Sequence, residues 1–164
     1  MGDEVVLLPK EISGRIRGLQ SHHQEKNRVL PGSRIAINIS GVDLDEIDRG
    51  DVVAWPNDYQ PTRRLDVHYQ HLGKQKKPLR HNQECKIFLG ADESIVRVRL
   101  LGKQQLLPGE NGWLQLELFD PVVAQRGDHY ILRRPSPSET IGGGTVVEPH
   151  PSKRHKRFDD QIIH

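Results

Sequence analysis

Arginines at strand positions are the residues of this 164-residue chain whose types and spacing could bind a ligand. Because side chains two residues apart in a strand point to the same face, a pair with that spacing presents two guanidinium groups from one side of a sheet. That geometry can follow a phosphate backbone through bidentate hydrogen bonds. A solvated outer face is an equally good interpretation, since the net charge is only +2 and aromatic residues make up 5%. The arginines concerned are Arg15, Arg17, Arg97, Arg99, Arg133 and Arg134.

Signatures of catalysis are missing from the sequence. No Gly-x4-Gly-Lys-Ser/Thr loop is present to hold nucleotide phosphates, and no Ser, His and acid residues show nucleophile-elbow spacing. The one glycine cluster, Gly142 to Gly144, follows polar loop residues. A tight crossing or a bulge in a strand is therefore favoured there over phosphate binding. We expect no catalytic residues and no enzymatic activity in this chain.

Histidine and cysteine indicate neither a metal site nor a crosslink. The closest pairs among the nine histidines are His22/His23 and His68/His71. Residues an odd number apart in a strand face opposite sides, so we expect no metal site. The single cysteine, Cys85, excludes an internal disulfide and suits a reducing compartment. No run approaches the roughly 18 apolar residues of a membrane span and no signal-peptide layout is present, so we expect a cytoplasmic protein outside the membrane.

Alternating apolar residues predict an all-β protein. The clearest strand is 34–39, in which Ile35, Ile37 and Ile39 would share one face. Further strands are predicted at 4–8, 14–19 and 52–55, with one helical turn at 45–47. A second series of strands, spaced by turns as in a small barrel, is predicted at 64–72, 84–89, 94–101, 113–119, 128–133 and 140–147.

These runs divide the chain into two small β-barrel modules and a tail. We place a partial barrel at 1–60, a second barrel at 61–150, and a basic linker or tail at 151–164, where the residues are charged and lack an apolar period. The first module has only about four strands, too few to close a barrel of about five or more, so it is predicted to be truncated at its N-terminus. An opened sheet leaves unpaired edges, so either a tendency to dimerise through that sheet or local disorder before residue 30 is expected.

Four segments are distinctive in their order and spacing. They are RIRGLQSH at 15–22, PGSRIAINISGV at 31–42, RGDV at 49–52 and TIGGGTVVEPHP at 140–151. Together they resemble the selenocysteine-specific translation elongation factor, from the later part of its second domain through its third. In that family a GTPase domain precedes two β-barrels, and winged-helix repeats that bind a messenger-RNA hairpin follow them.

The resemblance implies that these barrels bind tRNA and that the parent protein delivers selenocysteyl-tRNA to the ribosome in a GTP-dependent manner. Its partners would be selenocysteyl-tRNA, the ribosome and the parent's GTPase domain. No cofactor is expected in this chain, because GTP and Mg²⁺ would bind in the GTPase domain, which the resemblance does not cover. The opening strands of the second domain, which supply part of the aminoacyl pocket, also lie outside it. The segment after Pro151 would begin the link to the winged helices.

The resemblance also implies particular contacts. His22 and Arg34 fall where factors of this type contact the aminoacyl group. A selenol is largely ionised near neutral pH, so the Arg34 guanidinium could pair with the selenolate and His22 could add a donor. Gly142 and Gly143 fall in the segment that approaches the T-stem and acceptor arm, where glycine lets backbone come close to phosphates. The residues expected to contact phosphates are Arg97, Arg133 and Arg134.

Two other functions fit the same residues. The chain could be the equivalent region of a general translational GTPase, in which case it would have no selenium preference. It could instead be a protein-interaction barrel whose basic face docks on an acidic partner or on the parent's GTPase domain. Without the resemblance, Arg34 would be interpreted as a surface arginine beside a turn.

Overall fold

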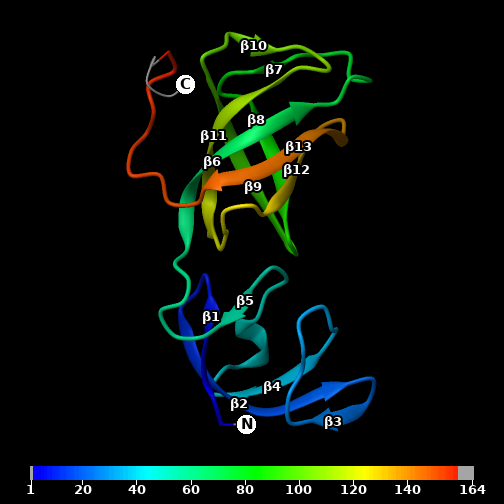
Figure 1. The fold of residues 1–164 in the computed structure, drawn as a ribbon, viewed down its shortest axis with the longest axis vertical. Coiled ribbons are helices and arrows are strands. Elements are labelled where there is room, and N and C mark those ends of the chain that lie inside the picture. The colour runs from blue at the N-terminus through cyan, green and yellow to red at the C-terminus, as the bar shows by residue number, and fades with distance from the viewer. Residues whose placement is uncertain (1, 159–164) are drawn as a thin grey trace. The chain divides into compact units, whose positions relative to one another are not determined.

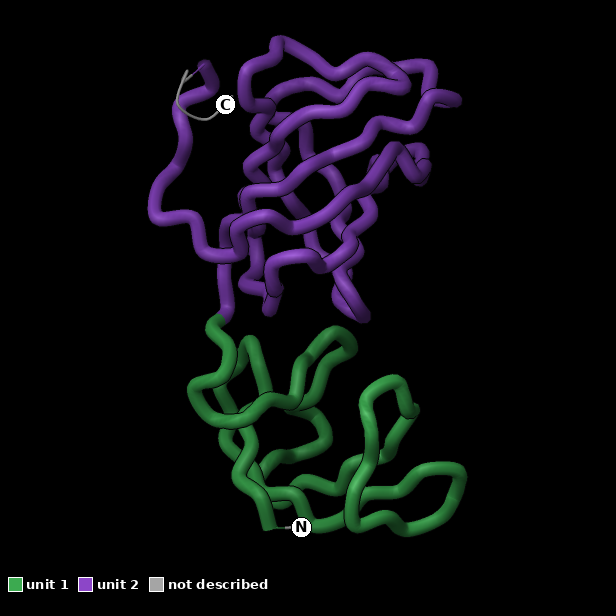
Figure 2. Tube along the Cα trace, viewed as in Figure 1, with its two compact units in different colours: residues 1–60 green, residues 61–164 purple. Residues whose placement is uncertain are grey.

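The computed structural model describes residues 2–158, which form an all-β protein (Figure 1). Within these residues the one helical element is a single 3₁₀ turn, η1 (Leu44–Glu46). The chain divides into two compact units, residues 1–60 and residues 61–164 (Figure 2). We call the first the N-terminal sheet and the second the barrel. The predicted fold class, a closed barrel preceded by a partial one, is confirmed.

The N-terminal sheet has five strands and does not close. Strand β2 lies at its centre and pairs with β1, β3 and β4, while β5 pairs with β1. The segment after residue 20, which the sequence predicts to be a polar loop, contains the short strand β3. This strand was not predicted because its three residues are all exposed and show no apolar alternation. The bounds are β1 (Glu4–Leu8), β2 (Ile12–Ser21), β3 (Gln24–Lys26), β4 (Ala36–Ser40) and β5 (Val52–Ala54).

One face of the N-terminal sheet is only half covered. Val5, Leu7 and Ile16 are buried, whereas Val53 and Trp55 are 37% and 53% exposed. A hollow of about 580 Å³ lies over this face, and its apolar lining includes Ile16, Val53 and Trp55. Apolar side chains therefore remain available for contact with another surface.

The barrel closes through six strands in the order β11-β6-β13-β12-β8-β9, with a small β7–β10 ribbon beside it. The interior of the barrel is filled by every second residue of its strands. On β9, Val96, Val98 and Leu100 are fully buried, while the residues between them face outward. The bounds are β6 (Thr62–His71), β7 (Leu79–Arg80), β8 (Glu84–Leu89), β9 (Asp92–Leu101), β10 (Gln105–Leu106), β11 (Asn111–Val122), β12 (His129–Arg134) and β13 (Glu139–Glu148).

The glycine cluster lies within β13, at a close strand crossing. An added Cβ would lie 2.3 Å from the Tyr69 hydroxyl at Gly142 and 2.0 Å from the His68 carbonyl oxygen at Gly144. The β12–β13 register also shifts next to Leu132. The glycines therefore let β13 pack directly against neighbouring backbone and the Tyr69 ring.

Cys85 is a core residue of the barrel. Burial raises the pKa of its thiol to about 12, so the group stays protonated and packs as a small apolar side chain. Among residues 2–158, no helix has the length and hydrophobicity needed to span a membrane.

Candidate functional site

The turn between β2 and β3 holds two histidines in an unfavourable backbone conformation. His22 and His23 have φ angles of 51° and 61°. A two-residue hairpin turn with positive φ at both positions is normally made by Asn-Gly, because a side chain in the left-handed region costs roughly 1–2 kcal/mol. Such strain persists where the surroundings or a function require the side chain. Both histidine side chains are exposed, so core packing does not explain their presence.

His22 and Arg34 line one hollow of about 450 Å³. The histidine turn follows β2, and Arg34 lies two residues before β4 begins at Ala36, so pairing of these two strands brings the residues together. The Ser21 hydroxyl also donates to the Arg34 carbonyl oxygen at 3.3 Å. In the part of the chain that the structure describes, no carboxylate pairs with the Arg34 guanidinium, which leaves it available for an anion.

We expect His23→Gly to raise the free energy of unfolding of the N-terminal sheet by about 1 kcal/mol, because glycine adopts a positive φ without the Cβ clash. Urea denaturation followed by circular dichroism measures this change. Ser21→Gly is the matched control, since Ser21 lies in β2 outside the positive-φ region, and it should lower stability. A destabilised His23→Gly protein would show that the turn is held by side-chain contacts and not strained.

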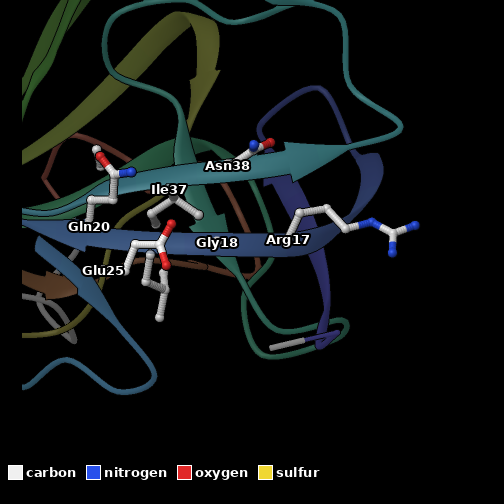
Figure 3. A pocket seen from close by; sticks show the side chains of 8 residues that line it. Arg17, Gly18, Gln20, Glu25, Ile37 and Asn38 are labelled. Carbon is white, nitrogen blue, oxygen red and sulfur yellow. The ribbon is translucent and has the colours of Figure 1, made fainter.

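A second hollow, of about 380 Å³, lies over β2, β3 and β4 (Figure 3). Arg17 is at one end, where the β2–β4 register shifts, and its Nε donates to the Ser40 hydroxyl at 3.0 Å. Glu25 lines the same hollow from β3. Arg15, which was predicted to share a face of the sheet with Arg17, is bound to Glu4 at 2.8 Å. Both arginines are exposed, yet each already has a partner.

The barrel brings Arg97 and Arg133 onto one outer wall. Arg133 on β12 lies opposite Lys86 on β8, and Arg97 lies on β9, the next strand around. Each guanidinium is stacked near a phenylalanine, Arg133 at 5.9 Å from the Phe88 ring centre and Arg97 at 5.5 Å from that of Phe119. Such stacking holds the planar group flat with its N–H groups at the edge, where Arg97 donates to Glu84 at 3.2 Å.

Arg134 points elsewhere, although it follows Arg133 directly. Its side chain is 12% exposed and is bound to Glu139 at 3.2 Å. It also donates to the Gln75 side chain at 3.1 Å and to the Lys77 carbonyl oxygen at 3.0 Å. These contacts assign Arg134 to holding the loop after β6 in place. The predicted arginines thus divide between an outer wall and an internal tether.

Gly142 and Gly143 are likewise committed to packing. Gly142 is buried against Tyr69, and a Cβ at Gly143 would lie 2.4 Å from the Tyr130 carbonyl oxygen. Tyr69 donates its hydroxyl within this crossing, to the carbonyl oxygen of Ile141 at 3.1 Å. The observed contacts of these glycines are therefore internal to the barrel.

Sequence reasoning missed several basic residues on the neighbouring wall of the barrel. Arg64 on β6 lies opposite Glu117 on β11, and Arg154 comes from the charged segment after β13. Arg99 was predicted to be either a phosphate contact or a solvated arginine of the outer face; it is 9% exposed because residues 151–158 cover it. Only the density of basic residues in that segment could have signalled these contacts. In the described range 2–158, no cluster of His, Cys, Asp and Glu is suited to a metal ion.

Comparison with known proteins accounts for both units. A model of elongation factor Tu domain 2 matches residues 1–54, and a model of the β-barrel domain of selenocysteine-specific elongation factor matches residues 64–153. A selenocysteine-specific elongation factor from Desulfomicrobium baculatum is 31% identical over 160 residues, which is 98% of this chain and 25% of that protein. The chain therefore spans about a quarter of that relative's length. Because the model of the β-barrel domain matches more than half of this chain, the chain belongs to the selenocysteine-specific elongation factor family.

Proposed function

We propose that the two units bind selenocysteyl-tRNA, as the barrel part of a factor that delivers it to the ribosome in a GTP-dependent manner. The observation that supports this most is the shared hollow of His22 and Arg34. The chain itself consists of barrel domains and does not include a GTPase domain. GTP and Mg²⁺ would therefore bind elsewhere in the parent protein, and the role of this part is binding in the cytoplasm, without catalysis.

The hollow suits a small anionic side chain on an esterified amino acid. A guanidinium is a cationic, planar donor, so Arg34 can pair with a selenolate through a charge-assisted hydrogen bond. A serine hydroxyl is neutral and gains less from the same donor. His22, which lines the same hollow from its turn, can supply a second hydrogen bond.

The outer wall of the barrel suits the RNA arm. Arg133 and Lys86 on paired strands, with Arg97 on the next, place cationic groups along three adjacent strands. Since Lys86 and Arg97 are bound to Glu93 and Glu84, Arg133 is the member of this wall for which the described residues offer no carboxylate. Arg133 is therefore the main phosphate contact in this proposal, and Arg97 a weaker one.

We expect Arg133→Ala to weaken tRNA binding and to reduce the slope of log affinity against log salt concentration by about one unit, because one phosphate contact is lost. Filter binding at several salt concentrations measures both values. Arg126→Ala is the control, since Arg126 is 71% exposed and bound to Glu148, and it should leave the slope unchanged. If Arg133→Ala keeps the wild-type affinity and slope, the wall does not contact tRNA.

The open N-terminal sheet supports an additional contact with a protein surface. We propose that its half-covered apolar face self-associates when no other partner covers it, because an exposed Trp55 beside Val53 favours burial. Sedimentation equilibrium of the chain should show a concentration-dependent dimer, and Trp55→Lys should shift it toward monomer. A monomer at every accessible concentration would contradict this and leave docking on the parent's GTPase domain as the use of the face.

A further inference from the structure

The charged segment 151–158 is bound along the outer wall of the barrel. Gln115, which faces outward on β11, is fully buried because this segment covers it. Its side-chain amide donates to Asp66 at 2.8 Å and to the Lys153 carbonyl oxygen at 3.1 Å, and accepts from the His155 backbone N–H at 3.1 Å. The His155 imidazole then contacts Asp66 at 2.6 Å. The Gln115 amide is thus buried with hydrogen-bond partners for both its nitrogen and its oxygen, which fixes the segment to the barrel at this point.

The segment is held at a second place further along. The Gly102 backbone N–H donates to the Arg157 carbonyl oxygen at 2.7 Å. The Arg157 guanidinium in turn donates to the carbonyl oxygens of Lys103 at 3.2 Å and Gln104 at 2.8 Å. Arg99 adds a hydrogen bond to the His155 carbonyl oxygen at 3.2 Å. Since both ends of 153–157 are tied, this part of the segment has a defined path and is not a free spacer.

Docking gathers arginines around one carboxylate. Arg154 Nε lies 2.7 Å from Glu117, and Arg99 Nε lies 3.8 Å from the same group. Arg64 and Arg97, on the two strands that flank β11, lie directly opposite Glu117 in register. Arg97 also has Glu84. Four guanidinium groups therefore lie near Glu117 and Glu84, while the third carboxylate here, Asp66 on β6, is bound to Gln115 and His155.

The excess positive charge is partly buried, which makes it costly without an anion. Burial, and after it the charge of Arg154, lowers the pKa of Arg99, in agreement with mutual repulsion of the cations. Lys153 and Lys156 are exposed along the segment and add to the charge. The wall is therefore a strongly basic surface in which the cations are already positioned.

We propose that segment 151–158 and the wall formed by β6, β9 and β11 bind the phosphate backbone of an RNA, so that the segment is part of the RNA interface. This proposal extends the proposed function, because Arg97 on β9 belongs both to this wall and to the Arg133 wall beside it. Phosphates along an RNA arm could continue from one wall to the next. The Arg157 guanidinium over the Phe158 ring at 5.0 Å provides a further flat donor of the same kind.

The test uses the 1–164 chain with fluorescently labelled tRNA and with a short RNA hairpin. Arg154→Gln combined with Arg157→Gln should weaken binding of both RNAs by about tenfold near physiological salt and reduce the salt slope by about two units. Arg126→Gln is the control outside this wall and should bind as wild type. Thermal melting should confirm that the barrel of the double variant stays folded.

Four results would overturn this proposal. If the double variant binds both RNAs as wild type while Arg133→Ala is weakened, the segment is not in the interface and the proposed tRNA-binding function stands. If neither variant affects binding, both proposals fail. If a polyglutamate peptide competes as well as unlabelled RNA of equal charge, the wall recognises an acidic protein. Competition by inorganic pyrophosphate alone, with no extra effect of the RNA chain, would instead assign the wall to a small phosphate ligand.

Discussion

Gly144→Ala is expected to lower the free energy of unfolding of the barrel by about 3 kcal/mol, near the upper end of the overpacking range. The new Cβ would lie 2.0 Å from the His68 carbonyl oxygen and 3.2 Å from the Tyr69 Cα, both on the backbone of β6. Backbone of a paired strand cannot move aside as a flexible side chain can. The same carbonyl oxygen accepts a hydrogen bond from Tyr130 at 3.1 Å, so a shift would also break that contact. Urea denaturation followed by Trp113 fluorescence measures the loss.

Gly73→Ala is the matched control in the same unit. The nearest atom to a Cβ there is the Gly109 Cα at 3.9 Å, an ordinary contact. Its φ is not positive, so alanine should change stability by no more than about 0.5 kcal/mol. Equal effects of the two substitutions would show that the β13 crossing relaxes, and that the glycines are needed for another reason, such as close approach of RNA.

Arg34→Ala is expected to remove most of the preference for selenocysteyl-tRNA over seryl-tRNA on the same tRNA body, by about 10- to 100-fold. This range corresponds to a hydrogen bond to a charged group, about 1.5–3 kcal/mol. Seryl-tRNA should be affected little, because a hydroxyl gains less from the guanidinium. Competition binding with the two aminoacylated forms, in the full-length factor with the complete second domain, measures the ratio.

Arg49→Ala provides the control for this experiment. Arg49 is an exposed arginine of the same unit that does not line the His22–Arg34 hollow, so its loss alters total charge equally. Discrimination should survive in that variant. If Arg34→Ala discriminates as well as wild type does, the selenolate pairing is wrong, and the residue would act only in general attraction of RNA.

Strands with apolar alternation could be located from the sequence because that signal is local. Ile35, Ile37 and Ile39 predicted the β4 region, and the six strands of the barrel were all predicted within a few residues of their bounds. Strands β3, β7 and β10 were missed, since they have two or three residues each. Such short strands are specified by the partner they meet and not by their own pattern.

The candidate site divides in the same way. The chain's amino acids alone determined the all-β fold, the open first sheet and, through the family resemblance, the choice of His22 and Arg34. Only tertiary structure decided that a β2–β4 pairing places these two in one hollow, that Arg133 faces outward while Arg134 is tethered inside, and that Arg99 is covered by residues more than fifty positions later. The physical reason is range: alternation and turn chemistry act between neighbours in the chain, whereas exposure and charge pairing depend on which distant segments pack together.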